Sequence, residues 1–164
     1  MHDLSLYLLD ILENSVRAGA SAIAIGIAAD RDAGVLTIAV EDDGPGLPVA
    51  PEQALDPFFT TKEHKKTGLG LSLFRQAAEG AGGGLDVGRS PDLGGVAVTA
   101  RMELRNVDRP PLGDVATSIL TMVATNPHVA FSIGLRDGDA RVQLRGDELP
   151  ARLPAIVAFQ EALA

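Results

Sequence analysis

Residues 56–73, which read DPFFTTKEHKKTGLGLSL, narrow the folds open to this chain. A basic segment runs into a Gly-Leu-Gly sequence, and the apolar run that follows predicts a helix from about residue 71 to 81. Backbone N–H groups at the start of a helix form an anion site, so this order of features favours a phosphate ligand. A Gly-Leu-Gly sequence is weak evidence by itself, and the surrounding chain has to identify the phosphate.

Hydrophobic patterns predict one helix before this stretch and strands on both sides of it. The helix can be capped by Asp3 or Ser5 and would end at Gly19. Residues 44–67 contain several prolines and glycines without sustained periodicity, which predicts a long loop of the kind that is usually functional or disordered. The expected strands are residues 21–29, 35–43, 85–89 and 95–104.

The chain after Leu104 has a different character. A Pro-rich connector, DRPPLGD, leads into an amphipathic helix near residues 115–123. Two strands joined by the turn RDGD and a final helix near residues 155–163 complete an α-β-β-α unit. We therefore expect a domain over residues 1–104 and an extension over 105–164. This extension either adds to the sheet or presents a surface to a partner.

Charge and composition exclude several classes of protein. The net charge of −8 argues against duplex nucleic acid as a partner, because binding its phosphates needs a basic face. The absence of cysteine rules out disulfides, thiolate metal sites and a cysteine nucleophile. No apolar run suits a membrane span or a signal peptide, so we expect a cytoplasmic protein that does not bind membranes.

One face of the first predicted helix carries Asp10, Asn14 and Arg17, spaced at i, i+4 and i+7. Such a row can be an ordinary solvated surface. It can also be a site, because an amide oxygen suits Mg²⁺, which is usually shared with substrate phosphates. A carboxylate one turn away could then orient or deprotonate an attacking hydroxyl or water.

The strand over residues 35–43 ends with an unusual acidic residue. Asp42 continues the parity of the apolar residues Leu36, Ile38 and Val40, so its side chain is expected on the buried face. A buried carboxylate must be paired or hydrogen-bonded. The Gly44-Pro45-Gly46 sequence that follows leaves room for a flat ring whose amino group donates to Asp42. The alternative is that Asp42 only begins a turn.

Four ordered segments resemble the motifs of the GHKL ATPases. They are DILENSVRAGAS, EDDGPGLP, DPFFTTK and TGLGLSL, which look like the N box, first glycine box, F box and second glycine box. This superfamily groups the ATP-binding domains of DNA gyrase, heat-shock chaperones, histidine kinases and MutL. The resemblance covers residues 3–104 and implies the Bergerat fold, an α/β sandwich with helices on one face of a mixed, mostly antiparallel sheet. A P-loop is absent.

The resemblance also implies a role for each matching residue. Asn14 resembles the Mg²⁺-binding asparagine, and Asp42 the adenine-binding aspartate, with Gly44 and Gly46 shaping the adenine pocket. Lys62 would reach the outer phosphate of ATP from a lid over residues 56–67. The lid motif comprises Phe58, Phe59, Thr60, Thr61 and Lys62, and the phosphate-binding turn comprises Thr67, Gly68, Leu69, Gly70 and Leu71.

Within the superfamily the motifs look most like those of histidine kinases. Arg17 resembles the basic residue that these kinases place three positions after the asparagine, where it would contact the nucleotide. Asp10 stands where gyrase-type ATPases carry a glutamate base, and Glu13 is the alternative base. Val96 departs from the threonine found in many of these strands, so adenine recognition would lack one hydrogen bond.

The implied ligands are ATP or ADP with Mg²⁺, and two functions remain open. One is a phosphotransferase that acts in trans on a Ser, Thr or His of a partner protein in a signalling system. The other is an ATP-gated binding module with little or no turnover. His2 lies too close to Asn14 for the helical hairpin that carries a phosphoacceptor histidine, so the resemblance is to a stand-alone ATP-binding domain.

Overall fold

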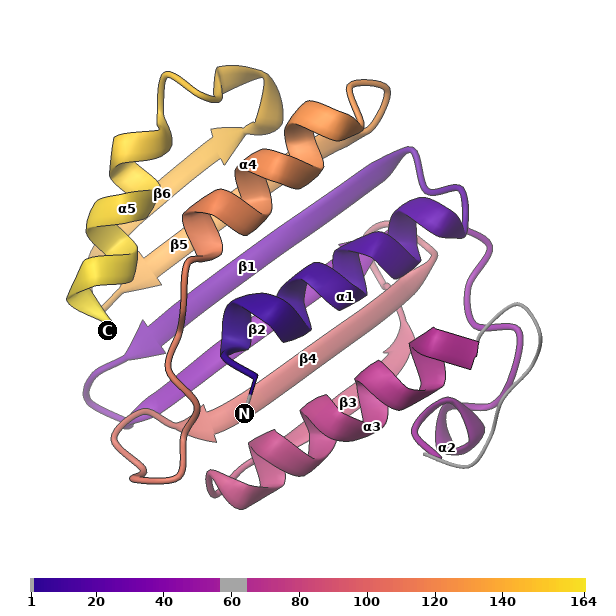
Figure 1. Cartoon of the computed structure of the whole chain (residues 1–164), viewed down its shortest axis with the longest axis horizontal. Coiled ribbons are helices and arrows are strands. Elements are labelled where there is room, and N and C mark those ends of the chain that lie inside the picture. Colours follow the sequence, from indigo (N-terminus) through magenta and orange to yellow (C-terminus); the bar gives the residue numbers. More distant parts are fainter. Residues whose placement is uncertain (1, 57–64) are drawn as a thin grey trace.

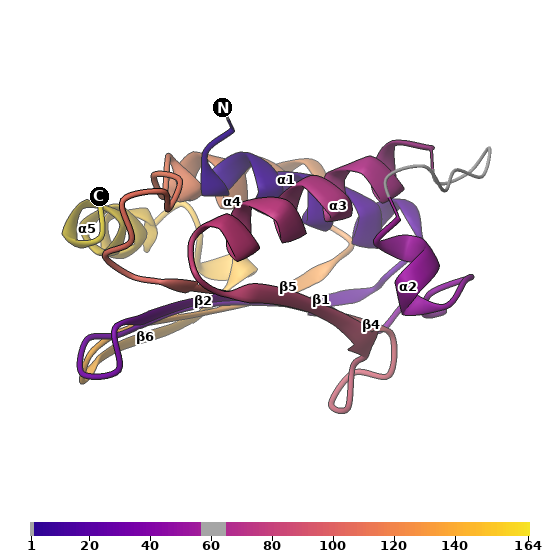
Figure 2. The same cartoon turned by 90° about the horizontal axis from the view of Figure 1, so that it is seen from below.

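A computed structural model of the chain describes residues 2–56 and 65–164, with only the backbone described for 65–69. A single six-stranded sheet carries its helices on one face, as the two views in Figure 1 and Figure 2 show. The helices are α1 (Leu4–Arg17), α2 (Pro51–Ala54), α3 (Lys65–Gly80), α4 (Val115–Thr125) and α5 (Leu153–Ala162), with a 3₁₀ turn at Gly146–Glu148. The strands are β1 (Ala22–Asp30), β2 (Val35–Asp42), β3 (Gly84–Arg89), β4 (Val96–Glu103), β5 (Ala130–Asp137) and β6 (Ala140–Arg145).

The strand order is β3-β4-β2-β1-β5-β6, and the pairing confirms the expected mixed, mostly antiparallel sheet. Among the strands of the described residues, only β1 and β5 run parallel, with Ile25 opposite Ile133. The other neighbouring strands are antiparallel. The predicted α/β sandwich with helices on one face is therefore confirmed.

The core lies between the sheet and the helices because both carry apolar residues at the matching period. In β1 every second side chain is buried, and Ile23, Ile25 and Ile27 face the helices. Helix α1 buries a stripe that includes Leu4, Leu8 and Leu12. The same side of α1 carries Ser15 to the end of β2, where its hydroxyl hydrogen-bonds Asp42.

The segment after Leu104 joins the same sheet. Strand β5 adds to the edge of β1, and β6 follows β5 as a hairpin. The connector between β4 and α4 passes the N-terminal end of α1 (Figure 1), where Pro111 and Leu112 accept hydrogen bonds from Leu4 and Ser5. Of the two possibilities for this extension, the structure shows the one in which it extends the sheet.

Two boundaries differ from the sequence-based expectation. Helix α3 begins at Lys65 and not near residue 71, so Gly68 and Gly70 lie within its first turns. Low helix propensity makes glycine look like a helix boundary, but the helix continues through both glycines here. The expected loop over residues 44–67 also contains the short helix α2.

Among the described helices, none combines the length and the apolar character needed to cross a membrane.

Candidate functional site

A pocket of about 620 Å³ lies where α1 faces the end of β2 and the start of β4. Its walls are apolar, and four polar side chains reach it from α1 and β2. This is the usual character of a site for a small organic ligand. The apolar walls include Ile11, Val40, Leu47, Leu71, Val96 and Val98, and the polar side chains are those of Asn14, Ser15, Arg17 and Asp42.

Asp42 is the most buried charged group at this pocket, with 3% of its surface exposed. Its Oδ1 accepts the backbone N–H groups of Gly44 and Val96, both at 3.0 Å. Its Oδ2 accepts the hydroxyl of Ser15 at 2.6 Å. A carboxylate has about four acceptor positions, so these three bonds leave one of them, on Oδ2, for a donor on a ligand.

The backbone turns around Asp42 leave no space for further side chains. A Cβ atom at Gly95 would overlap the Asp42 carboxylate and lie 2.6 Å from the Gly44 nitrogen. A Cβ atom at Gly44 would lie 3.2 Å from Asp42 Oδ1. Gly46 has φ +89, a conformation that favours glycine. Close backbone approach therefore encloses the carboxylate and keeps the pocket open beside it.

Asn14 and Arg17 line the outer part of the pocket. The Arg17 guanidinium donates to Asn14 Oδ1 at 3.3 Å in an exposed hydrogen bond. Among the described residues no group of three or more His, Cys, Asp or Glu side chains could hold a metal ion. The amide oxygen of Asn14 is of the kind that Mg²⁺ accepts when phosphates and water supply its other ligands.

Asp10 lies one turn from Asn14 but outside the lining of the pocket. Its carboxylate faces α3, where a Cβ atom at Gly70 would lie 3.5 Å from Asp10 Oδ2. Part of the side chain is exposed to solvent, yet burial against α3 raises the pKa of Asp10, while the charges of His2 and Arg17 act in the opposite direction. Glu13 is exposed and also lies outside the pocket lining.

The structure thus brings Asn14, Arg17, Asp42, Gly46 and Leu71 to one pocket, with Gly44 against Asp42. Asp10, Glu13 and Gly70 are described but do not line this pocket. Two further sets of predicted residues lack a described side chain or position. The side chains of Thr67 and Leu69 are not described, and Gly68 is known only as part of α3. Phe58, Phe59, Thr60, Thr61 and Lys62 lie outside the described residues.

Three features of the site were missed by the sequence reasoning: Ser15, Gly95 and the backbone N–H of Val96. Ser15 did carry a signal, because it interrupts the apolar stripe of α1 and a buried hydroxyl needs a partner. Gly95 follows Gly94 before β4, and of the two only Gly94 has the positive φ that favours glycine, so Gly95 was a signal of close backbone approach. Nothing in the sequence pointed to the N–H of Val96.

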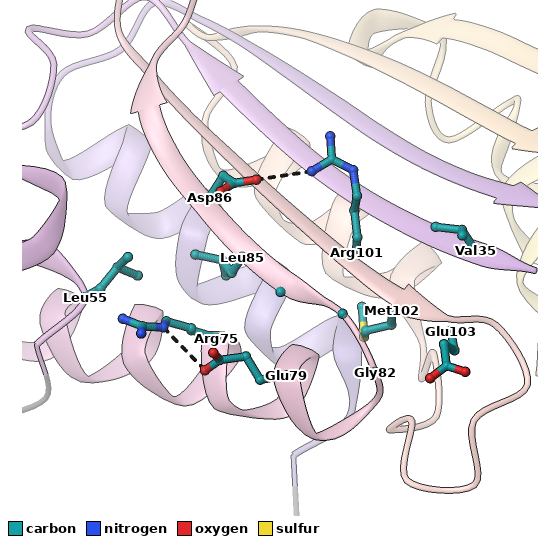
Figure 3. Close-up of a pocket in the computed structure, with 12 residues that line it drawn as sticks. Val35, Leu55, Arg75, Glu79, Gly82, Leu85, Asp86, Arg101, Met102 and Glu103 are labelled. Atoms are coloured by element: carbon teal, nitrogen blue, oxygen red, sulfur yellow. Dashed lines mark hydrogen bonds and ion pairs between the residues drawn. The ribbon is translucent and has the colours of Figure 1, made fainter.

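A second hollow, of about 650 Å³, lies at the other end of the β3–β4 hairpin (Figure 3). Part of its lining is the backbone of Gly82, Gly83 and Gly84, which carry no side chains. Its carboxylates are already engaged, because Glu79 pairs with Arg75 at 3.4 Å and Asp86 with Arg101 at 3.2 Å. Glu103 accepts from Asn106. Since no charged group here lacks a partner, we assign the functional site to the first pocket.

Comparison with known proteins identifies the family. A model of the family described as "Histidine kinase-, DNA gyrase B-, and HSP90-like ATPase" matches residues 2–106. The chain belongs to this ATPase family. It is therefore an ATP-binding domain, and the GHKL resemblance is confirmed.

Curated relatives within this ATPase family are bacterial sensor kinases. The chain is 36% identical to the sensor histidine kinase CpxA of Escherichia coli K12 over 101 residues, which are 58% of this chain and 21% of the kinase. It is 35% identical to the sensor protein kinase PilS of Pseudomonas aeruginosa over 100 residues, 57% of this chain and 19% of the kinase. The chain thus spans about a fifth of the length of these relatives.

A solved structure shares the ATPase fold over nearly the whole chain. It is the Aquifex aeolicus MutL ATPase domain complexed with ADP, which aligns with a TM-score of 0.52 and 18% identity. The alignment covers 96% of this chain and 70% of the MutL chain. At this identity the match shows the common fold alone.

Proposed function

We propose that this domain binds Mg-ATP or Mg-ADP in the pocket beside Asp42 and transfers phosphate from ATP to a Ser, Thr or His of another protein. The observation that carries the proposal is the single free acceptor position of Asp42 in a slot with apolar walls. The curated relatives, named as sensor kinases, support a role in signalling.

The geometry around Asp42 favours adenine over guanine. Adenine carries an amino group that can donate to the free position on Oδ2, and its flat ring suits the walls formed by Val40, Val96 and Val98. Guanine carries a carbonyl at the same ring position. That carbonyl would face the carboxylate without a donor between them. A buried charged group left unmatched costs about 1–3 kcal/mol or more, roughly ten- to a hundredfold in affinity.

The other predicted site residues take the roles that their resemblance to the family motifs implies. Asn14 would supply its amide oxygen to Mg²⁺, which neutralises charge on the phosphates when bound. Arg17 would contact the nucleotide beside Asn14. Gly44 and Gly46 would shape the base pocket, and residues 67–71 would face the phosphates. We assign Phe59, Thr60, Thr61 and Lys62 to the lid, with Lys62 at the outer phosphate, because of their resemblance to the F box.

Asp10 is our candidate for the base that takes the proton from an attacking hydroxyl. Burial raises the pKa of its carboxyl, and a higher pKa makes a carboxylate a stronger base near neutral pH. Its position one turn from Asn14 places it on the same side of α1 as the proposed metal site. Glu13 is the alternative base.

A second function, an ATP-gated binding module with little turnover, is favoured by one observation. Asp10 does not line the pocket, and its carboxylate faces Gly70 of α3. In that case nucleotide binding alone would change the affinity for a partner. The two functions share the same nucleotide site and differ only in whether phosphate leaves it.

Titration calorimetry with ATP and GTP tests the nucleotide site. We expect ATP to bind roughly ten- to a hundredfold more tightly than GTP, and Asp42→Asn to lose most of the affinity for ATP. Equal affinities for the two nucleotides would contradict the assignment of Asp42.

Incubation with γ-labelled ATP and cell lysate then separates the two functions. Label on a discrete protein supports transfer, whereas nucleotide-dependent retention without label supports the switch.

A further inference from the structure

The connector between β4 and α4, residues 105–114, completes the N-terminal end of α1. The first backbone N–H groups of a helix have no partner within the helix. In α1 two of them donate to the connector, with Leu4 bonded to Pro111 and Ser5 to Leu112, both at 2.9 Å. Carbonyl groups more than a hundred residues away in sequence thus cap the helix that carries Asn14.

The connector also fits closely against the N-cap residue of α1. Asp3 accepts the backbone N–H of Leu6 at 3.1 Å and the hydroxyl of Ser5 at 2.5 Å. Gly113 has φ +75, and a Cβ atom there would lie 2.5 Å and 2.6 Å from the two carboxylate oxygens of Asp3. The bend at Gly113 therefore brings the backbone of the connector against the cap, so close that a Cβ atom at Gly113 would force the Asp3 carboxylate to shift.

Helix α4 continues this contact along the side of α1. Ser118 approaches the carbonyl of Ser5 at 3.5 Å, and Val115, Ile119 and Met122 are buried in the common core. The start of α4 is held in turn by α5, because the Ala116 N–H donates to Gln160 Oε1 at 2.9 Å. Helix α1 is thus held both at its first turn and along one side by the segment after residue 104.

A constraint at the first turn of α1 extends to the pocket because the helix is continuous. Ten residues separate Leu4 from Asn14, which corresponds to about 15 Å along the axis. Ser15, which hydrogen-bonds Asp42, follows in the same turn as Asn14. A movement of α1 along its axis would therefore displace both the proposed metal ligand and the partner of Asp42.

We infer that the connector and α4 position α1 for nucleotide binding, with Gly113 and Asp3 as the positioning residues at the cap. The segment after residue 104 is then part of the ATP-binding unit, and not a separate appendage. Removal of the connector from the cap would weaken the nucleotide site from a distance. The nucleotide measurement below rests on the proposed function, whereas the exchange measurement does not.

Substitution of Gly113 tests the inference in the full chain. Gly113→Ala places a Cβ atom against the Asp3 carboxylate, and Gly34→Ala is the matched control. Gly34 has φ +70, but a Cβ atom there would meet nothing within 4 Å. We expect Gly113→Ala to weaken Mg-ATP binding by about 5- to 150-fold, the range typical of coupled sites. Gly34→Ala should retain the wild-type affinity once both proteins are shown to be folded by circular dichroism.

Hydrogen exchange without nucleotide provides the independent readout. In Gly113→Ala the amides of residues 10–18 should exchange faster than in Gly34→Ala. In the wild type the Leu4 and Ser5 amides should exchange slowly, unlike ordinary first-turn amides.

Free exchange of these two amides overturns the inference, even if Gly113→Ala does not fold. Equal exchange of residues 10–18 in the two variants also overturns it. Altered exchange together with no ATP binding by the wild type would refute the proposed function and support the positioning role.

Discussion

The Ser15 hydroxyl donates a hydrogen bond to Asp42 Oδ2 at 2.6 Å, and both side chains are buried, with 5% and 3% of their surfaces exposed. This bond joins α1 to the end of β2, and both residues line the pocket that we propose for the nucleotide. It satisfies one acceptor position of the carboxylate and leaves the next free for a ligand. The residue after Asn14 therefore sets which acceptor position of Asp42 stays open to the pocket.

Loss of the Ser15 hydroxyl should impair both stability and nucleotide binding. In Ser15→Ala the Asp42 carboxylate keeps two backbone donors and loses the third, which should cost about 1–3 kcal/mol of unfolding free energy. Chemical denaturation and calorimetry with ATP measure the two effects.

Ser90→Ala is the matched control for this substitution. Ser90 is also buried and donates to a carboxylate, that of Glu41 at 2.8 Å, but it does not line the pocket. We expect it to lose stability without a change in the affinity for ATP. Equal ATP affinities in the two serine variants would remove Ser15 from the site.

Gly95→Ala should abolish nucleotide binding and destabilise the fold. The new Cβ atom would overlap the Asp42 carboxylate and the backbone beside it, so the part of the pocket at the start of β4 has to move. Gly94→Ala separates this overlap from backbone strain, because Gly94 has φ +87 and a Cβ atom there would meet nothing within 4 Å. If the two variants have the same affinity for ATP, the close approach of Gly95 to Asp42 is not required for binding.

Substitutions on α1 should separate metal binding from chemistry. Asn14→Ala removes the proposed Mg²⁺ ligand and should weaken the binding of Mg-ATP while sparing metal-free nucleotide.

Asp10→Asn keeps the size of the side chain, so affinity should change little and turnover should fall by roughly 10²–10⁴-fold. Calorimetry with and without Mg²⁺ and a labelled-phosphate assay measure the two effects. An unchanged rate in Asp10→Asn would exclude Asp10 as the base, and Glu13→Gln would be the next variant.

Asp10→Asn should also raise the melting temperature at neutral pH. Burial raises the pKa of Asp10 in the folded state, so the folded protein binds this proton more tightly than the unfolded chain does. Ionisation of Asp10 therefore destabilises the fold above the raised pKa, and this penalty disappears below the unfolded pKa of about 4. Melting curves between pH 7 and pH 3.5 should show a benefit of the asparagine that shrinks as the pH falls. A benefit that is constant with pH would contradict this account.

Local patterns in the sequence determined most of the elements and the family. The period-two alternation in β1 and β2 identified the strands, and its parity placed Asp42 on the buried face, where the structure has it. The four ordered motifs identified the ATPase family, because each is a contiguous segment whose residue types and spacing are visible in the chain itself.

Contacts between distant segments were decided only by the tertiary structure. Alternation is the same in a strand with a parallel or an antiparallel neighbour, so the sequence did not show that β5 pairs with β1. Helix α3 begins at Lys65 although Gly68 and Gly70 have low helix propensity, so local propensity alone placed its start too late. The bonds of Ser15 and Val96 to Asp42 span 27 and 54 residues. Such pairs have no local signature, because each partner is chosen by the way the sheet and helices pack.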